Sequence, residues 1–239
     1  MNNLTKYRAG GFEDLEAITF DHFNTLLHQT NEGEEDIIYP IIRALQEKMH
    51  LDEKRFIAAY TDLDRKYRQN MMETFFETEL DEIVYNALVG SGHLCSELAE
   101  MVEASVDAGL ASRQLTWFPD ARDTLVHLKE EGYRLGLISN THWRWTPERW
   151  RQVQPFFDVI TLSYEHGYVK PHPSIFHKTL SELNVEPGKC LHVGDDPYAD
   201  VQGAKCVGMK TAYVKRNELD SEADIVIQRL SELIQYLAK

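Results

Sequence analysis

A single aspartate, Asp21, stands at the end of a short apolar and β-branched run, Ala17 to Phe20. A carboxylate delivered by the end of a buried strand is placed to act as a nucleophile. Two positions later, where a second acid would serve as general acid and base, the residue is Phe23. The sequence therefore predicts a covalent catalyst that lacks one expected part.

Two polar clusters later in the chain are suited to an anionic ligand. Ser139-Asn140 follows an apolar run and offers a hydroxyl group and turn amides to an anionic oxygen. Lys170-Pro171 presents a cation on a rigid loop. Each cluster is also common in ordinary turns and on surfaces. Their order along the chain is therefore more informative than either cluster alone.

An acidic turn from Gly194 to Asp200 contains further carboxylates, among them Asp195 and Asp196, and precedes a predicted helix. Carboxylates in this turn, close to Asp21, would repel one another unless a divalent cation neutralised them. Magnesium prefers oxygen ligands, so it is the expected ion.

These clusters must be positioned by an alternation of strands and helices. Strands are expected at residues 15–20, 134–139, 159–163, 190–194, 211–214 and 224–227, with helical segments between the later ones. From residue 36 to about 111 the apolar residues recur at helical spacing, with no strand signal. This pattern predicts an α/β protein with a doubly wound, Rossmann-like parallel sheet and an inserted helical segment. Each polar cluster then follows the carboxyl end of a strand, where such sheets bind ligands.

Composition narrows the class of protein. The 239 residues include 25 basic and 39 acidic ones, and the net charge of −14 disfavours nucleic acid and anionic membrane surfaces as partners. The three cysteines, Cys95, Cys190 and Cys206, form no disulfide or zinc pattern, and we expect Cys190 and Cys206 to be small core residues. Without a signal-peptide or membrane-spanning pattern, a cytoplasmic, soluble protein is expected.

The four motifs, in this order and spacing, resemble those of the haloacid dehalogenase-like hydrolase superfamily, in the branch with a helical cap inserted after the first strand. The motifs are Asp21 to Leu26, Ser139-Asn140, Lys170-Pro171 and Gly194 to Asp200. The resemblance covers nearly the whole chain. It implies a hydrolase core from residues 1–30 and 112–239, and a helical cap from residues 31–111.

The resemblance also implies roles for individual residues. Asp21 would be the nucleophile, Ser139 and Asn140 would hold the transferring group, and Lys170 would neutralise its charge. Magnesium would be bound by Asp21, Asp195 and the backbone carbonyl of Phe23. Asp200 would orient Lys170 or the groups around the metal. Asp196 would contribute at most through water.

Phe23 departs from the pattern of the phosphatases in this superfamily, which usually have an aspartate there that protonates the leaving group and then activates water. His22 and His142 are candidate replacements for that acid. His172 is expected instead to cap a helix that begins near Pro173. The 2-haloacid dehalogenases also have an aromatic residue at the position of Phe23, because a halide leaves without a proton.

The resulting expectation is a magnesium-dependent phosphatase that acts on a small phosphorylated metabolite through an aspartyl-phosphate on Asp21. It would be slow, or restricted to good leaving groups. The alternatives are a 2-haloacid dehalogenase-like hydrolase, disfavoured by the retained Asp195 and Asp196, and a non-catalytic protein that binds a ligand or a partner. Either a monomer or a homodimer is compatible with the sequence.

Overall fold

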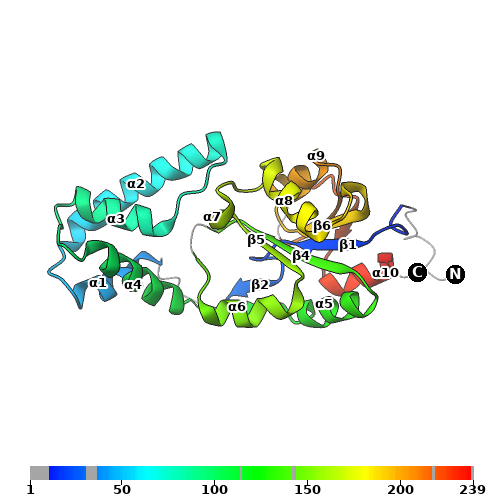
Figure 1. The fold of residues 1–239 in the computed structure, drawn as a ribbon, viewed down its shortest axis with the longest axis horizontal. Coiled ribbons are helices and arrows are strands. Elements are labelled where there is room, and N and C mark those ends of the chain that lie inside the picture. The colour runs from blue at the N-terminus through cyan, green and yellow to red at the C-terminus, as the bar shows by residue number, and fades with distance from the viewer. Residues whose placement is uncertain (1–10, 31–36, 114, 142–143, 217–218, 238–239) are drawn as a thin grey trace.

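The computed structural model describes residues 11–30, 37–113, 115–141, 144–216 and 219–237. Figure 1 shows two parts, a purely helical one and one in which helices cover both faces of a sheet. The expected domain limits at residues 1 and 31 lie outside the described residues, as does His142. Among the described residues, every helix is too short or too polar to cross a lipid bilayer.

The main sheet is parallel throughout and has the strand order β5-β4-β1-β6-β7-β8. Its strands are β1 (Ala17–Phe20), β4 (Arg134–Ser139), β5 (Val159–Leu162), β6 (Cys190–Gly194), β7 (Lys210–Val214) and β8 (Ile225–Ile227). These bounds agree with the predicted strands to within two residues. The predicted α/β class with a doubly wound, Rossmann-like sheet is confirmed.

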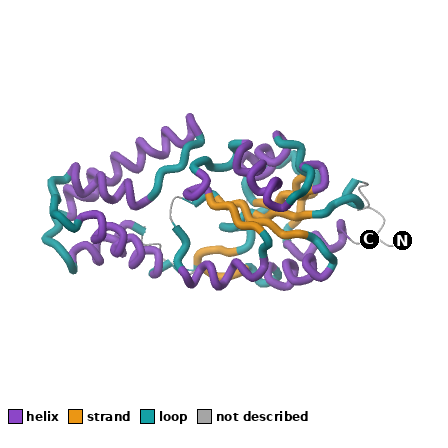
Figure 2. Tube along the Cα trace, viewed as in Figure 1, coloured by secondary structure: helices purple, strands orange, loops and turns teal. Residues whose placement is uncertain are grey.

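Helices cover both faces of this sheet (Figures 1 and 2). One layer contains α5 (Ala121–Glu130), α6 (Pro147–Val153) and α10 (Leu233–Leu237), and the other contains α8 (Pro173–Leu183) and α9 (Gly203–Cys206). Alternate strand residues face opposite layers, so Ile18 packs with α5 while Ala17 packs with α8. Shorter helical turns are α7 (Ser163–His166), Gln154–Phe156, Pro187–Lys189, Pro197–Gln202 and Leu230–Glu232.

The helical part lies between two short strands of the chain. Its helices are α1 (Ile38–Gln46), α2 (Glu53–Thr74), α3 (Leu80–Gly90) and α4 (Leu98–Ala111). They bury a hydrophobic core of their own, which includes Ile41, Phe56 and Val106. The apolar residues at helical spacing therefore stabilise this part by packing its helices against one another.

An antiparallel pair of strands was not predicted. β2 (Leu27–Gln29) pairs with β3 (Leu115–Trp117) and forms a small second sheet where the chain enters and leaves the helical part. Each strand has three residues, too few to show an alternating pattern. Their pairing joins segments far apart in the sequence, which only the tertiary structure reveals.

The helical part also contacts the loop that precedes Lys170. The backbone N–H of Glu77 donates to the carbonyl of Gly167, and the N–H of Val169 donates to the carbonyl of Phe75, both at 2.9 Å. The buried carboxylate of Glu77 accepts a hydrogen bond from Ser163 at 2.6 Å. The two parts are thus joined by ordered backbone contacts close to one of the motifs.

One expectation about the core is wrong. Cys190 is buried in β6, as expected, but Cys206 is exposed at the end of α9. The neighbouring Ala204 is the residue of that helical turn that packs into the core. A single turn buries only one side, so its cysteine faces the solvent.

Candidate active site

Lys170 connects two buried aspartates at the carboxyl end of the parallel sheet. Its Nζ donates hydrogen bonds to Oδ1 of Asp21 and to Oδ1 of Asp200, each at 2.6 Å. Asp21 directly follows β1, and Asp200 lies in the helical turn after β6. Adjacent parallel strands therefore bring together two of the predicted motifs, and the loop after α7 adds the third.

The side chain of Asp195 completes an acidic cluster. Carboxylate oxygens of Asp21, Asp195 and Asp200 lie within 4.8 Å of one another. Asp195 is half-buried and accepts a hydrogen bond from Thr25 at 3.2 Å. With all carboxylates ionised, three negative charges face the single positive charge of Lys170. The cluster then has two negative charges in excess, which matches the charge of a divalent cation.

Electrostatics distinguish the three carboxylates. Burial raises the pKa of Asp21 to about 6, although Lys170 opposes the shift. Burial, together with the charges of Asp21 and Asp200, raises the pKa of Asp195 to about 7. Burial also opposes ionisation of Asp200, but Lys170 and a hydrogen bond from His192 outweigh it and lower the pKa of that carboxyl. Asp200 is therefore the permanent anion beside Lys170.

Asp200 is held from several directions. His192, on β6, places Nε2 at 3.2 Å from its Oδ1, while the other ring nitrogen lies 2.9 Å from the hydroxyl of Thr19. The backbone N–H of Asp196 donates to Oδ2 of Asp200 at 3.0 Å. His192 was not predicted as a site residue, although a histidine within a strand that is otherwise nearly all apolar is a detectable signal.

Asp196 does not belong to this acidic cluster. Its Oδ1 accepts hydrogen bonds from the backbone N–H groups of Tyr198 and Ala199 at 2.8 and 2.9 Å. This is the geometry of a helix cap, and the residue is exposed. The position of its carboxylate is thus explained by local backbone bonding.

Ser139 and Asn140 lie at the end of β4, on the other side of Asp21. Ser139 is buried and lines a cavity. The side-chain amide of Asn140 donates to the carbonyl of Lys170 at 3.0 Å and accepts from its N–H at 2.7 Å. Both ends of that amide therefore hold the lysine loop, a contact that the sequence did not predict.

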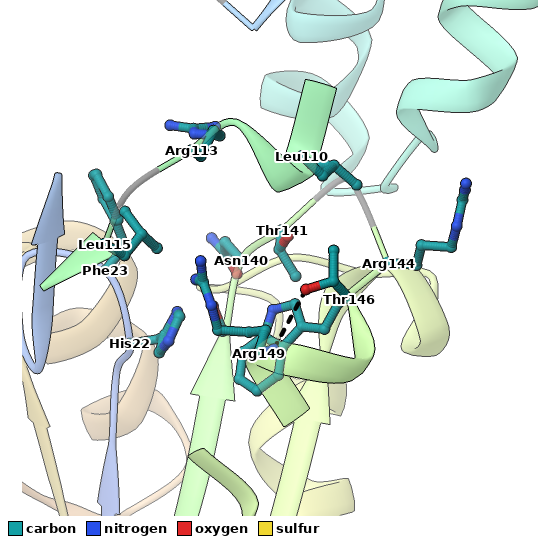
Figure 3. A pocket seen from close by; sticks show the side chains of 12 residues that line it. His22, Phe23, Leu110, Arg113, Leu115, Asn140, Thr141, Arg144, Thr146 and Arg149 are labelled. Atoms are coloured by element: carbon teal, nitrogen blue, oxygen red, sulfur yellow. Dashed lines mark hydrogen bonds between the residues drawn. The ribbon is translucent and has the colours of Figure 1, made fainter. Parts of the chain in front are cut away.

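Phe23 and His22 face the same cavity, which has a volume of about 130 Å³ (Figure 3). The Phe23 side chain is 38% exposed, whereas His22 is buried and contacts Trp145 with ring centroids 4.7 Å apart. Burial, with smaller effects from Arg149 and Lys170, lowers the pKa of His22 to about 3. His22 is neutral at pH 7, which makes it a poor general acid and a weak base.

His172 has the structural role expected for it. Its Nδ1 accepts a hydrogen bond from the backbone N–H of Ser174, at the start of α8. The predicted helix cap is therefore present. Trp145 and Trp150 pack against the hydrophobic core of the sheet, with their ring centroids 5.2 Å apart.

The sequence matches the family of haloacid dehalogenase-like hydrolases over residues 15–208, a range that contains all four motifs. Glyceraldehyde 3-phosphate phosphatase of Pyrococcus furiosus is 42% identical over 130 residues, which cover 51% of this chain and 54% of that relative. The chain spans about half the length of the curated relatives that it matches.

Solved structures resemble almost the whole chain. A 2-haloacid dehalogenase from Pseudomonas syringae pv. Tomato DC3000 has a TM-score of 0.72 at 23% identity, covering 94% of this chain and 98% of that one. A HAD phosphatase from Thermococcus onnurineus has a TM-score of 0.55 at 27% identity, with the same coverage. The first likeness concerns the fold alone. The family match over most of the chain, together with this fold, shows that the protein belongs to the haloacid dehalogenase-like hydrolases.

Proposed function

We propose that the protein is a magnesium-dependent phosphatase that acts on a small phosphorylated metabolite through an aspartyl-phosphate on Asp21. The observation that carries this proposal is the cluster of Asp21, Asp195 and Asp200 around Lys170, with two negative charges in excess. The resemblance of half the chain to glyceraldehyde 3-phosphate phosphatase supports a phosphorylated substrate.

The donor set fits magnesium. Asp21 and Asp195 would hold the ion, with the backbone carbonyl of Phe23, because carboxylate and carbonyl oxygens are its preferred ligands. The raised pKa values of Asp21 and Asp195 indicate negative charge that the described residues do not fully neutralise. When bound, magnesium would stabilise negative charge on the phosphoryl oxygens and on Asp21.

The residues around the ion have separate roles in this proposal. Asp21 attacks the phosphorus atom, and Lys170 donates hydrogen bonds to the transferring group and offsets its charge. Ser139 binds a phosphoryl oxygen through its hydroxyl group. Asp200 and Asn140 orient Lys170, the first through its Nζ and the second through its backbone.

Phe23 leaves the departing oxygen without a nearby carboxylic acid. The neutral His22 does not replace that acid, since its pKa of about 3 means that the ring is not protonated to imidazolium at pH 7, and a neutral imidazole is too weak an acid to protonate a leaving group. His142 lies outside the described residues. Loss of general acid and base catalysis costs on the order of 100- to 10,000-fold in rate. We therefore expect slow turnover, or a substrate whose leaving group needs no protonation.

The helical part, from residue 31 to about 111, acts as a cap over the hydrolase core in this proposal. Its contacts with the loop before Lys170 support motion coupled to the site. The net charge of −14 supports a small-molecule substrate rather than nucleic acid or a membrane as partner. A cytoplasmic monomer or homodimer is proposed.

Phe23 also favours a second candidate, a 2-haloacid dehalogenase-like hydrolase. Its aromatic side chain faces the cavity beside Asp21, and displacement of halide by a carboxylate requires no proton. Against this candidate stands the acidic cluster, which has no evident use without a cation. The third possibility is a protein that binds a ligand without turnover, and the acidic cluster is equally compatible with it.

The test measures phosphate and halide release from a panel of phosphate monoesters and 2-haloacids, with magnesium or with a chelator. Magnesium-dependent phosphate release, abolished by Asp21→Asn, is expected. Halide release that is insensitive to the chelator would replace the proposal by the dehalogenase. If the folded protein binds magnesium but releases neither product, the non-catalytic alternative is supported.

A further inference from the structure

The cavity beside Ser139 is bordered by positive charge as well as by Phe23. Arg113, at the return from the helical part, and Arg149, on α6, both line it. Figure 3 shows the side chain of Arg149 extending from α6 towards the space between His22 and Asn140. Two arginines from different parts of the fold thus border one small cavity, and the Arg113 guanidinium also donates a hydrogen bond to Oε1 of Gln29 at 2.8 Å.

The Arg149 guanidinium has no hydrogen bond or ion pair with any residue in the described ranges. This is unlike Arg144 on the same cavity, which forms ion pairs with Asp81 at 2.6 Å and with Asp107 at 2.9 Å. Burial and the neighbouring charge of Arg113 lower the pKa of Arg149 to about 10, and Glu148 offsets only part of this shift. A half-buried cation without an anionic partner is a costly arrangement that a bound anion would relieve.

An independent observation concerns His22 on the same wall of the cavity. His22 is only 4% exposed, and its Nε2 makes no hydrogen bond to the described residues. Orphaned polar atoms at this depth are uncommon in folded proteins, and they often face a ligand or water. As the Nε2–H tautomer, the neutral ring can donate one hydrogen bond into the cavity.

We propose that this cavity binds a second anionic group of the substrate, a carboxylate or a phosphate, through Arg149, Arg113 and His22. Arg149 and Arg113 supply charge-assisted hydrogen bonds, and the planar guanidinium suits the paired oxygens of either group. The substrate is then a doubly anionic phosphate ester. Its reacting phosphoryl group lies at Asp21, and the other anion lies beside Ser139.

The sequence around the second motif offered a signal for this site. Arg144, Arg149 and Arg151 follow Ser139-Asn140 within twelve residues, in a chain that is acidic overall. Only the tertiary structure separates their roles. Arg144 is neutralised by aspartates of the helical part, Arg151 is exposed, and Arg149 enters the cavity.

The inference rests on the proposed phosphatase function for the position of the first anion, so its test uses ligands that no phosphatase can hydrolyse. Binding of phosphonates is measured by titration calorimetry on the full chain, with magnesium in excess. Phosphonoacetate and 3-phosphonopropionate carry a carboxylate, and ethylphosphonate and propylphosphonate are their singly functionalised counterparts. Methylenediphosphonate carries a second phosphonate instead of a carboxylate. Comparing it with phosphonoacetate shows whether the cavity prefers a phosphate or a carboxylate as the second anionic group.

At least one doubly anionic ligand is expected to bind about 10- to 100-fold more tightly than its counterpart, as for a hydrogen bond to a charged group. Arg149→Gln should abolish this preference, and Arg149→Lys should restore part of it. The matched control is Arg151→Gln, which changes an exposed arginine on the same helix. It should leave the preference intact.

Three outcomes would overturn the inference. The first is that the wild-type protein shows no preference for doubly anionic ligands, and the second is that the preference survives in Arg149→Gln. The third is that Arg149→Gln weakens the binding of singly and doubly anionic ligands equally. The last result would assign Arg149 to the reacting phosphoryl group. A preserved preference in a protein that hydrolyses no phosphate ester would instead reject the phosphatase and keep the anion site.

Discussion

Gly194 and Asp200 are in such close contact that a β-carbon on the glycine would lie 2.2 Å from Cγ of the aspartate. No side chain can occupy that space without moving Asp200. The same carboxylate accepts hydrogen bonds from Lys170 and interacts with His192. The absence of a side chain at the end of β6 is therefore a requirement of the buried ion pair.

Gly194→Ala should consequently destabilise the protein by about 1–3 kcal/mol, the usual cost of overpacking a core. It should also weaken magnesium binding, because Asp200 would be displaced from Lys170. Chemical denaturation and magnesium titration measure the two effects. Gly188→Ala is the control, since an added β-carbon there meets no atom within 4 Å. Equal behaviour of the two variants would contradict the prediction.

Magnesium binding should weaken as the pH falls. Asp21 and Asp195 have pKa values raised to about 6 and about 7, so they take up protons between pH 8 and 5.5 and lose the charge that attracts the ion. In the metal-free protein these two carboxyl groups have the opposite effect on the free energy of unfolding, which they lower as the pH rises. For an acid whose pKa is raised on folding, the contribution to stability is fully present below the ordinary pKa of 3.8 and is lost as the pH rises from there through the folded values of about 6 and about 7.

The measurement is the increase in melting temperature that magnesium causes, recorded at several values of pH. We expect a larger increase at pH 8 than at pH 5.5. Using the difference between samples with and without magnesium removes the contribution of distant histidines. Asp195→Asn should reduce the increase at every pH. An increase that is independent of pH in the wild-type protein would argue against these carboxylates as ligands.

Phe23→Asp should raise phosphatase activity. The side chain at this position faces the cavity beside the nucleophile, and an acid there could protonate the leaving group. The increase in kcat should not exceed about 100- to 10,000-fold, which is the usual contribution of general acid and base catalysis. Phe23→Asn provides the matched control without an acid. A similar response to both substitutions would show that space, rather than proton transfer, limits the reaction.

Arg149→Gln should stabilise the ligand-free protein. Its guanidinium is half-buried beside Arg113, and the lowered pKa means that the folded state disfavours its charge. After allowance for solvent screening at a partly exposed site, we expect an increase of about 2–4 °C in Tm, which corresponds to about 1 kcal/mol in a chain of this size. Thermal unfolding measures it, with Arg151→Gln as reference. A lower Tm for Arg149→Gln would indicate a structural role for this arginine.

The main sheet and the order of the motifs could be predicted from local patterns of residues. Strands such as β4 and β6 are mostly apolar runs between helical segments, and that pattern depends only on neighbouring residues. The positions of Asp21 and Asp200 followed from the rule that parallel strands end at one edge, whereas Lys170 reaches them from the loop after α7. Local patterning was sufficient for these features because the buried strands and the polar turns after them are contiguous in sequence.

Which polar groups neutralise one another depends instead on how the chain folds. The β2–β3 pair, the support of Asp200 by His192 and the different environments of Arg144 and Arg149 depend on contacts between distant segments. Charge and hydrogen bonding act through space over a few ångströms, and their effect on a pKa depends on burial. The four motifs could therefore be predicted from the sequence. The arrangement of the acidic cluster around Lys170 and of the cavity lined by Arg149 could be seen only in the folded chain.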